Sequence, residues 1–361
     1  MRFPGRVCIY DKERICMEDL NLKPVQKAAL SLIQNDLRFL YTVIKRINPN
    51  ESNYIPSLLP YMGVIIDGAE EWVKAINNSS KVKLEIPIFS KSEQNYYEEM
   101  RNSIKMWQNE YSVIYEALKE TYRVSDDYFG NVCKPIAKKM KLYDIFGVDR
   151  ANGVICGNTI LCYYYSPLFS YGRNNGEFIK AMSVIGGKYI KLFDATKEYP
   201  VDTSIKYDVR DYGGFVKSPV GNVFSDKFIL FSVLCQINFI VCCIDFWVRE
   251  EISTKMRFAY LLYYSLLHII PQINSKLKAN LVIDTKWESW QFRNTMAHYK
   301  LGVALKKDEL LFEDKLFGLT QKYFKSDYLT VKNGIMQELE SLACQIGDYL
   351  QLKDAVIKVN R

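Results

Sequence analysis

Apolar residues recur at helical spacing through the first third of the chain. Leu30, Ile33 and Leu37, followed by Leu40 and Ile44, repeat every three or four positions and so share one face of a helix. The helices expected from this pattern cover 22–47, 54–76 and 92–124. Residues 1–124 are therefore predicted to form an N-terminal helical region.

The same periodicity returns after residue 220. Ile335, Leu339, Leu342 and Ile346 form an apolar stripe on the final helix, which is expected to pack against the preceding one through Met296 and Tyr299. The long helices expected here cover 225–250, 253–277, 286–301 and 333–352.

The middle of the chain, residues 125–219, has a different texture. Glycines gather there, and three segments alternate as strands do, which predicts a hairpin or small sheet. These segments are 188–193, 204–209 and 215–217. The fold class expected from the pattern is mainly α, with a small mixed α/β insertion or linker between two helical regions, 1–124 and 220–361.

The run from Phe228 to Trp247 is apolar enough to be mistaken for a membrane span. It contains Gln236, Asn238 and Asp245, which would be costly in lipid. A buried helix is the favoured interpretation, and no contact with a membrane is expected.

Composition places few further bounds on function. The 361 residues are 48% hydrophobic and 25% charged, which indicates an ordered globular protein with room for a large core. A formal charge of +7, from 48 Lys and Arg against 41 Asp and Glu, permits an anionic partner without requiring one. The cluster Lys134, Lys138, Lys139 and Lys141 is either a solvated helix face, which is favoured, or a phosphate contact.

Cysteine and histidine usage argues against a metal site. The chain has nine cysteines, an odd number, and its first residues lack the apolar core of a secretory leader, so a reducing cytoplasm is expected. With two histidines and no zinc-type spacing, neither a metal nor another cofactor is expected.

The candidate chemistry lies in the helix expected at 286–301, where Thr285 and Glu288 could form a capping box at its start. Phe292, Met296, Tyr299 and Val303 should form its buried stripe. That helix carries the sequence Arg293-Asn294-Thr295-Met296-Ala297-His298.

The opposite face of this helix is expected to carry Asn294 and His298 together with Trp287 and Trp290. Paired tryptophans are unusual on a solvated face and are enriched where a partner covers the surface. Trp287 and Trp290 are therefore the expected dimer interface.

The residue types Arg293, Asn294 and His298 suit phosphodiester chemistry. Arginine offers a planar donor fork for phosphate, histidine titrates near neutral pH, and asparagine can orient the ring or the substrate. The long arginine stem could let the three side chains converge.

The spacing of Arg293, Asn294 and His298 resembles the active-site motif of the HEPN superfamily, helical ribonucleases and nucleotide-binding proteins. The resemblance covers about residues 220–361 and implies an up-and-down four-helix bundle with the motif on its third helix. The segment 302–332 is longer than the loop of a minimal bundle.

The resemblance further implies a metal-independent endoribonuclease in which the ribose 2′-oxygen attacks the adjacent phosphate. His298 would transfer protons, Arg293 would bind the phosphate and Asn294 would orient the ring or phosphate, with RNA contacts at Lys300 and, more weakly, at Lys134, Lys138 and Lys139. It also implies a homodimer that joins two motifs, and a toxin, abortive-infection or antiviral-defence role in the cytoplasm, with a possible antitoxin or regulator.

Other interpretations remain open from the sequence. The runner-up is a non-catalytic helical scaffold that binds a nucleotide or a partner. Arg101-Asn102 repeats the Arg-Asn pair without a following histidine, so an ordinary exposed pair is favoured over a decayed duplicate. His268 is expected to be a core or interface residue.

Overall fold

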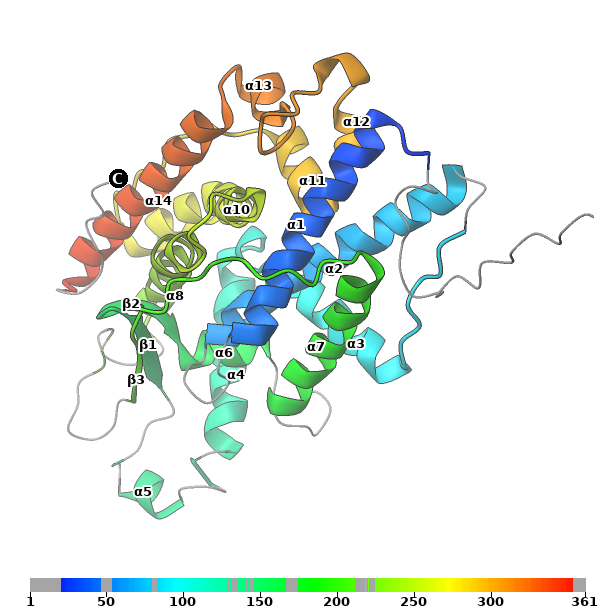
Figure 1. Cartoon of the computed structure of the whole chain (residues 1–361). Coiled ribbons are helices and arrows are strands. Elements are labelled where there is room, and N and C mark those ends of the chain that lie inside the picture. The colour runs from blue at the N-terminus through cyan, green and yellow to red at the C-terminus, as the bar shows by residue number, and fades with distance from the viewer. Residues whose placement is uncertain are drawn as a thin grey trace, which may run out of the picture.

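The protein is mainly helical, with one small antiparallel sheet, in a computed structural model (Figure 1). The structure therefore confirms the predicted fold class, which is mainly α with a small β element. The structure describes residues 21–46, 54–79, 83–128, 130–131, 135–140, 142, 146–166, 175–211, 218, 220 and 225–352.

The N-terminal helices follow the periodicity closely at first. Helix α1 covers Pro24–Arg46 and α2 covers Tyr54–Ser79. The single helix expected at 92–124 is instead two helices, α3 (Lys91–Ser103) and α4 (Tyr111–Tyr128), separated by a short 3-10 turn. That turn, η2 (Met106–Gln108), buries Met106 and Trp107 and directs Gln108 toward α10 and α11.

The sheet has the order β2-β1-β3, from β1 (Gly147–Ala151), β2 (Val154–Asn158) and β3 (Tyr207–Asp211). Asn152 and Gly153 join β1 to β2, and both have positive φ, 48° and 83°. An Asn-Gly pair between two strands is a strong hairpin signal because both residues tolerate this conformation. The expected strand at 204–209 overlaps β3, and 215–217 lies outside the described residues.

The strand expected at 188–193 was wrong, because this segment ends helix α7 (Asn175–Leu192). Its apolar residues belong to a longer helical repeat, in which Met182, Ile185 and Tyr189 are buried. Over only six residues, part of a helical repeat cannot be distinguished from the alternation of a strand.

Four helices form the main C-terminal elements among the described residues. They are α8 (Lys227–Asn238), α10 (Ser253–Leu277), α11 (Trp290–His298) and α14 (Tyr328–Leu350). The expected helix at 225–250 continues from α8 through a π-helical segment, η4 (Phe239–Ile244), into α9 (Asp245–Trp247). Shorter elements complete the fold: α5 (Pro135–Lys139), α6 (Thr159–Tyr165), α12 (Leu301–Ala304), η5 (Lys307–Glu309) and α13 (Leu319–Phe324).

The apolar run at Lys227–Trp247 is long and hydrophobic enough to cross a membrane by length and composition. In the structure 94% of its most apolar window is buried within the protein. It packs against α14 and β2, as the expectation of a buried helix requires.

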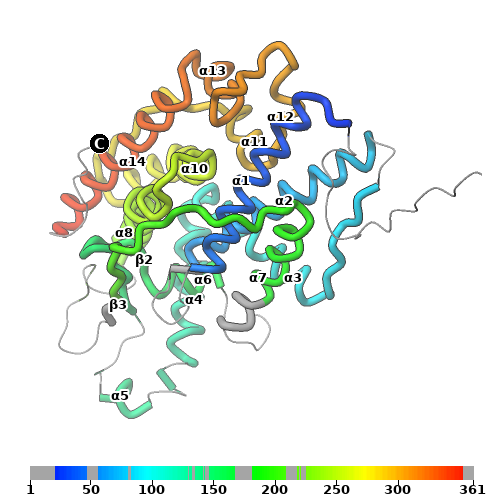
Figure 2. The backbone as a smooth tube through the Cα atoms, in the orientation of Figure 1, coloured from blue at the N-terminus to red at the C-terminus, as the bar shows by residue number. Residues whose placement is uncertain are grey.

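A single hydrophobic cluster draws on all three expected regions. Leu37 of α1, Ile155 of β2 and Leu339 of α14 belong to it. Helix α1 packs on α2 and α7 and also on α10 and α12, and the tube in Figure 2 shows it crossing the middle of the molecule. Buried contacts therefore cross both boundaries of the three-part division, which itself stays a prediction.

A buried ion pair joins the N-terminal region to the C-terminal helices. Asp36 of α1 and Arg257 of α10 are almost fully buried, with 2.9 Å between Nε and Oδ2. Thr254 and Tyr299 donate hydroxyl hydrogen bonds to the same carboxylate, each at 2.5 Å, and Arg257 donates to the main-chain oxygen of Met296. A buried pair is tolerated when additional hydrogen bonds satisfy both charges, as here.

We expect Asp36→Ala to lower the free energy of unfolding by about 3–5 kcal/mol, because it leaves the Arg257 guanidinium buried without its counter-charge. Denaturant unfolding of the purified protein measures the change. As a control, Arg123→Ala breaks ion pairs whose guanidinium is 61% exposed and should leave stability almost unchanged. Equal, small losses in both variants would contradict a structural role for the buried pair.

Candidate functional site

The motif helix α11 begins later than the sequence predicted. Its N-cap is Ser289, whose hydroxyl accepts a hydrogen bond from Phe292 N at 3.2 Å, so the expected capping box at Thr285 and Glu288 was wrong. Tyrosine hydroxyls of α10 bind the carbonyls of Asp284, Trp287 and Ser289, which holds the chain before α11 in a non-helical path.

Helix α11 ends directly after His298. Tyr299 has φ 51° and ψ 33°, the left-handed conformation that terminates a helix and is unfavourable for a bulky side chain. Its ring lies 3.7 Å from the guanidinium carbon of Arg257, and its hydroxyl binds Asp36. These contacts hold Tyr299 in the strained conformation and so fix the position of His298.

The motif helix α11 packs mainly on α10 and α2 and not closely on α14, which corrects the expected contact with the final helix through Met296 and Tyr299. The Tyr299 ring lies against Gly68 of α2, where a Cβ atom would overlap the ring. Val303, expected at the end of the buried stripe, is 86% exposed because α11 stops before reaching it. Phe292 and Met296 are buried as expected.

The imidazole of His298 faces a carboxylate that the sequence did not predict. His298 Nδ1 lies 3.9 Å from Oδ2 of Asp67, which is on α2. Arg101 of α3 pairs with the same oxygen at 3.0 Å, and the Tyr97 hydroxyl donates to Oδ1 at 3.3 Å. The His298 side chain is 35% exposed and Asp67 only 11%, so the histidine lies between solvent and a shielded carboxylate.

The surroundings of Asp67 favour its ionised form. Burial acts to raise the pKa of Asp67, but the His298 imidazole, the Arg101 guanidinium and the Tyr97 hydroxyl together outweigh it and hold that pKa below its usual value. Burial, followed by the charge of Asp67, raises the pKa of Tyr97, which therefore remains a hydrogen-bond donor.

A cavity of about 1020 Å³ opens beside His298. Helices α1 and α2 form an apolar wall with Val25, Trp72 and Ile76. The polar lining is Lys23, Gln26, Asp67, Glu71, Ser79, Arg101, His298, Lys300 and Lys307. We call this cavity the His298 pocket.

Arg293 and Asn294 do not line the His298 pocket. Arg293 Nη1 donates to Asn294 Oδ1 at 3.0 Å and Nη2 to Gln108 Oε1 at 2.7 Å. Of the three side chains that were expected to converge, only Arg293 and Asn294 contact each other. Among the described residues, no hydrogen bond joins either of them to His298.

Arg293 is half-buried and has no acidic partner among the residues that the structure describes. Both residues that accept from its guanidinium are neutral amides, and its buried Nε has no hydrogen-bond partner within the described part of the chain. Burial lowers the pKa of Arg293, which expresses the cost of holding a positive charge away from water.

The two tryptophans lie in different environments. Trp290 is 61% exposed, but Trp287 is 5% exposed and packs edge-on against Phe324 at 5.7 Å. The assignment of Trp287 to a dimer interface was wrong, because the non-helical path before α11 turns its indole into the core beside Gly334. Trp290 remains available to a partner.

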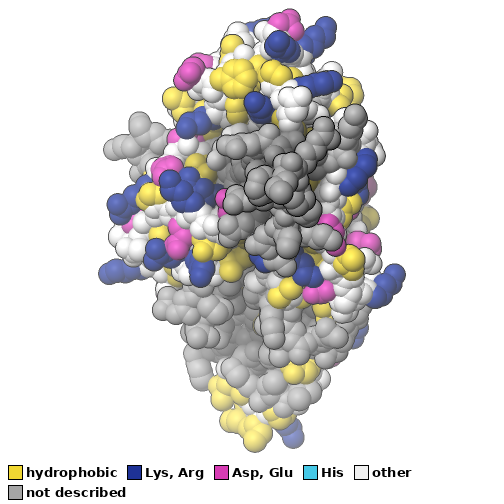
Figure 3. Space-filling view, turned by 45° about the vertical axis from the view of Figure 1, so that its right-hand side comes forward, with side chains coloured by type: hydrophobic (Ala, Val, Ile, Leu, Met, Phe, Trp, Pro, Cys, Tyr) yellow, Lys and Arg dark blue, Asp and Glu magenta, His cyan; other side chains and the backbone are white. Residues whose placement is uncertain are grey.

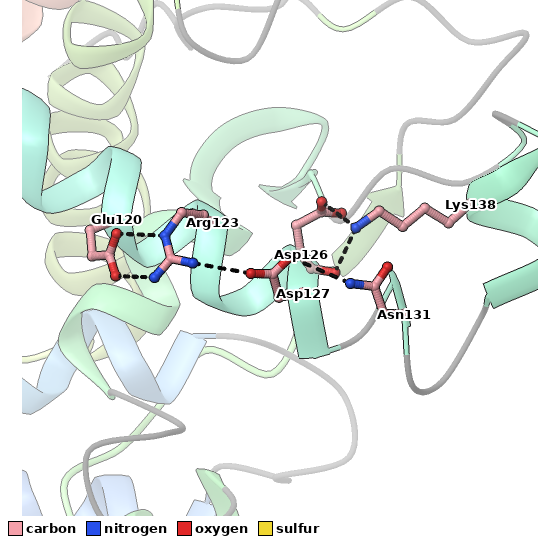
Figure 4. A network of polar contacts seen from close by, with 6 residues as sticks. All are labelled: Glu120, Arg123, Asp126, Asp127, Asn131 and Lys138. Atoms are coloured by element: carbon pink, nitrogen blue, oxygen red, sulfur yellow. Dashed lines mark hydrogen bonds and ion pairs between the residues drawn. The ribbon is translucent and has the colours of Figure 1, made fainter.

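The expected RNA-binding lysines also lie in different places. Lys300 is exposed and lines the His298 pocket. Lys138 pairs with Asp126 at 2.6 Å and is part of a network that includes Asn131 and Arg123 (Figure 4). Lys139 is exposed on α5, at the opposite end of the molecule from α12 in Figure 1, and Lys134 lies outside the described residues.

Two smaller expectations also changed. Arg101 is not an ordinary exposed residue, because it pairs with Asp67 beside His298. His268 is 45% exposed and contacts Gln272, so it is not a core residue. The Arg101-Asn102 pair was visible in the sequence as a repeat of the Arg-Asn pair of the motif. Its spacing gave no indication that Arg101 lies near His298, almost two hundred positions away.

Comparisons of the chain with models of protein families, with curated proteins and with solved structures find no match. Within the described ranges, no group of three or more His, Cys, Asp or Glu side chains could hold a metal ion. The assignment of chemistry thus depends on the geometry around His298.

We expect Asp67→Asn to lower the free energy of unfolding at neutral pH, and the difference from the unaltered protein to shrink on acidification. The folded-state pKa of Asp67 is lowered, so its stabilisation is present above the ordinary carboxyl pKa of about 4 and is lost as the pH falls through the folded value. Denaturant unfolding of both proteins from about pH 7 to pH 3 measures this.

The matched control is Asp127→Asn, which alters a carboxylate that is 54% exposed on α4. It should change stability little at any pH. A destabilisation by Asp67→Asn that stays constant down to pH 3 would show that the charge of Asp67 is not what matters.

Proposed function

We propose that the protein is an endoribonuclease that cleaves RNA by attack of a ribose 2′-oxygen on the adjacent phosphate. The observation that carries the proposal is the imidazole of His298, held at a helix end beside Asp67 on the wall of a pocket edged by cationic side chains. This reaction needs proton transfer, alignment and stabilisation of charge on phosphorus, and no metal ion need take part.

His298 would be the proton-transfer group. Asp67 would orient the imidazole and stabilise its protonated form, as a buried carboxylate does for a catalytic histidine. The distance of 3.9 Å is longer than a hydrogen bond, and such contacts commonly shorten when substrate binds.

Arg293 would bind the scissile phosphate, with Asn294 supporting its guanidinium. The absence of a carboxylate partner among the described residues favours this role, because a half-buried cation gains most from an anionic ligand. A phosphate oxygen could replace Gln108 Oε1 as the acceptor of the hydrogen bond from Arg293 Nη2.

We further propose that α8, α10, α11 and α14 correspond to a HEPN-type four-helix bundle with the motif on its third helix, although α11 packs on α2 as well as on α10. Helices α8 and α14 pack together, and α10 packs on both α11 and α14. In that family type a second chain supplies the opposing motif, so we propose a homodimer in which Trp290 takes part.

A role in toxin activity, abortive infection or antiviral defence in the cytoplasm belongs to the same proposal, as does an antitoxin or regulator. These follow from the resemblance of the motif. The second candidate function is a nucleotide-binding scaffold without catalysis, which the size of the His298 pocket favours.

We expect His298→Ala to reduce cleavage of mixed-sequence RNA at least a hundredfold without unfolding the protein, because the side chain is partly exposed and lies outside the core. The assay follows fragment formation in a buffer that contains a chelator. His268→Ala, which removes the second of the two histidines, should cleave normally.

Equal cleavage by His298→Ala and the unaltered protein would remove His298 from the mechanism. RNA binding without cleavage in the unaltered protein would favour the scaffold over the enzyme.

We expect Trp290→Glu to convert a dimer into a monomer and to lower cleavage at least tenfold, because it places a charge in the proposed interface. Light scattering and the cleavage assay report the two effects. Phe312→Glu is the matched control, since Phe312 is also 61% exposed, and it should change neither. A monomeric unaltered protein that cleaves RNA would overturn the dimer.

A further inference from the structure

The His298 pocket has an uneven distribution of charge. Glu71 pairs with Lys74 at 3.0 Å, and Asp67 is shared between Arg101 and His298. Both carboxylates in the lining therefore already have cationic partners.

Three lysines of the lining, in contrast, have no acidic partner among the described residues. Lys23, Lys300 and Lys307 are exposed, and none of them forms an ion pair within the described residues. They come from the residue before α1 and from both sides of α12, so one cavity collects ammonium groups from the N-terminal and C-terminal helices. On the face shown in Figure 3, Lys and Arg side chains are interspersed with Asp and Glu.

The interior of the pocket is apolar and large. Trp72, Ala75 and Ile76 of α2 face Val25 and Ala29 of α1 across it. Its volume of about 1020 Å³ is at the upper end of the range for small-ligand sites, about 300–1,000 Å³. An apolar wall beside unpaired cations matches a ligand that has one flat, weakly polar part and one anionic part.

We infer that the His298 pocket is a nucleotide subsite, which takes one unpaired base of an RNA strand against α1 and α2 while Lys23, Lys300 and Lys307 bind the flanking phosphates. The identity of the polymer rests on the proposed ribonuclease function. A base that is stacked and paired in a duplex cannot enter such a pocket, whereas an unstacked base of a single strand can.

This subsite gives the N-terminal helices a part in substrate binding. The motif lies on α11, but the apolar wall and one lysine come from α1 and α2. A chain reduced to residues 220–361 would lack this surface.

The test measures binding of a short 2′-O-methyl RNA of mixed sequence to the full chain by fluorescence anisotropy at several salt concentrations. The methylated strand cannot supply the attacking hydroxyl, so binding is observed whether or not the protein is a ribonuclease. A failure of catalysis and a failure of the subsite are thereby distinguishable.

The triple variant Lys23→Ala/Lys300→Ala/Lys307→Ala should bind at least tenfold more weakly at low salt. Its plot of log affinity against log salt should be less steep by about 2, since each phosphate contact on a single strand contributes about 0.7. Lys276→Ala, which removes an exposed lysine in the last turn of α10 that does not line the pocket, should change neither value.

A second variant tests the apolar part. Ala75 is exposed on α2 and lines the pocket, so Ala75→Trp should fill the cavity without disturbing the core and should weaken RNA binding at least tenfold. The salt dependence should stay unchanged, because the lysines remain.

Competition then separates a nucleotide from a simple anion. A nucleoside monophosphate should displace the RNA at lower concentration than inorganic phosphate or a polyglutamate peptide of the same ionic strength. The inference is overturned if Ala75→Trp binds normally, if Lys276→Ala weakens binding as much as the triple variant, or if phosphate or polyglutamate competes as well as the nucleotide.

Discussion

The contact between Asp36 and Arg257 is the constraint on which the rest of the structure depends. Both charges are removed from water, so each must find its partners within the fold, and those partners lie on three separate segments of the chain. Thr254 is on α10, Tyr299 follows α11, and Asp36 is on α1. Because a displaced partner would leave a buried charge uncompensated, the pair fixes how α1 meets α10 and where α11 must end.

That constraint reaches the candidate site through Tyr299. Its ring covers Arg257 and lies against Gly68, and its left-handed backbone ends α11 at His298. His298 is consequently presented to Asp67 on α2 rather than to solvent alone. The start of the same helix also differs from the expectation, because Ser289 is the N-cap in place of Thr285 and the Trp287 side chain is buried. Packing against α10, rather than helix propensity, decides both ends of the motif helix.

Two cationic groups near the site contrast in their pairing. Arg101 is neutralised by Asp67, and it helps keep that carboxylate ionised. Within the described residues, Arg293 has only amide acceptors and no acidic partner. None of the three lysines of the His298 pocket forms an ion pair in that part of the chain either. Cations without acidic partners favour an anionic ligand, and this feature underlies both the proposed cleavage of RNA and the proposed nucleotide subsite.

The sequence by itself determined the helical class, the bounds of α1 and α10 within a few residues, and the motif Arg293, Asn294 and His298, because periodicity and spacing are local properties. The pattern predicted a strand at 188–193, where a short alternation is part of the longer helical repeat of α7. The predicted strands did not include β1 and β2, although the Asn152-Gly153 pair between them is a hairpin signal. Only the tertiary structure decided that Asp67 and Arg101 meet His298, that Trp287 is buried and that Arg293 lies outside the pocket. These are contacts between segments far apart along the chain, and they are set by the packing of α1, α2 and α10 around buried charges, which no local pattern encodes.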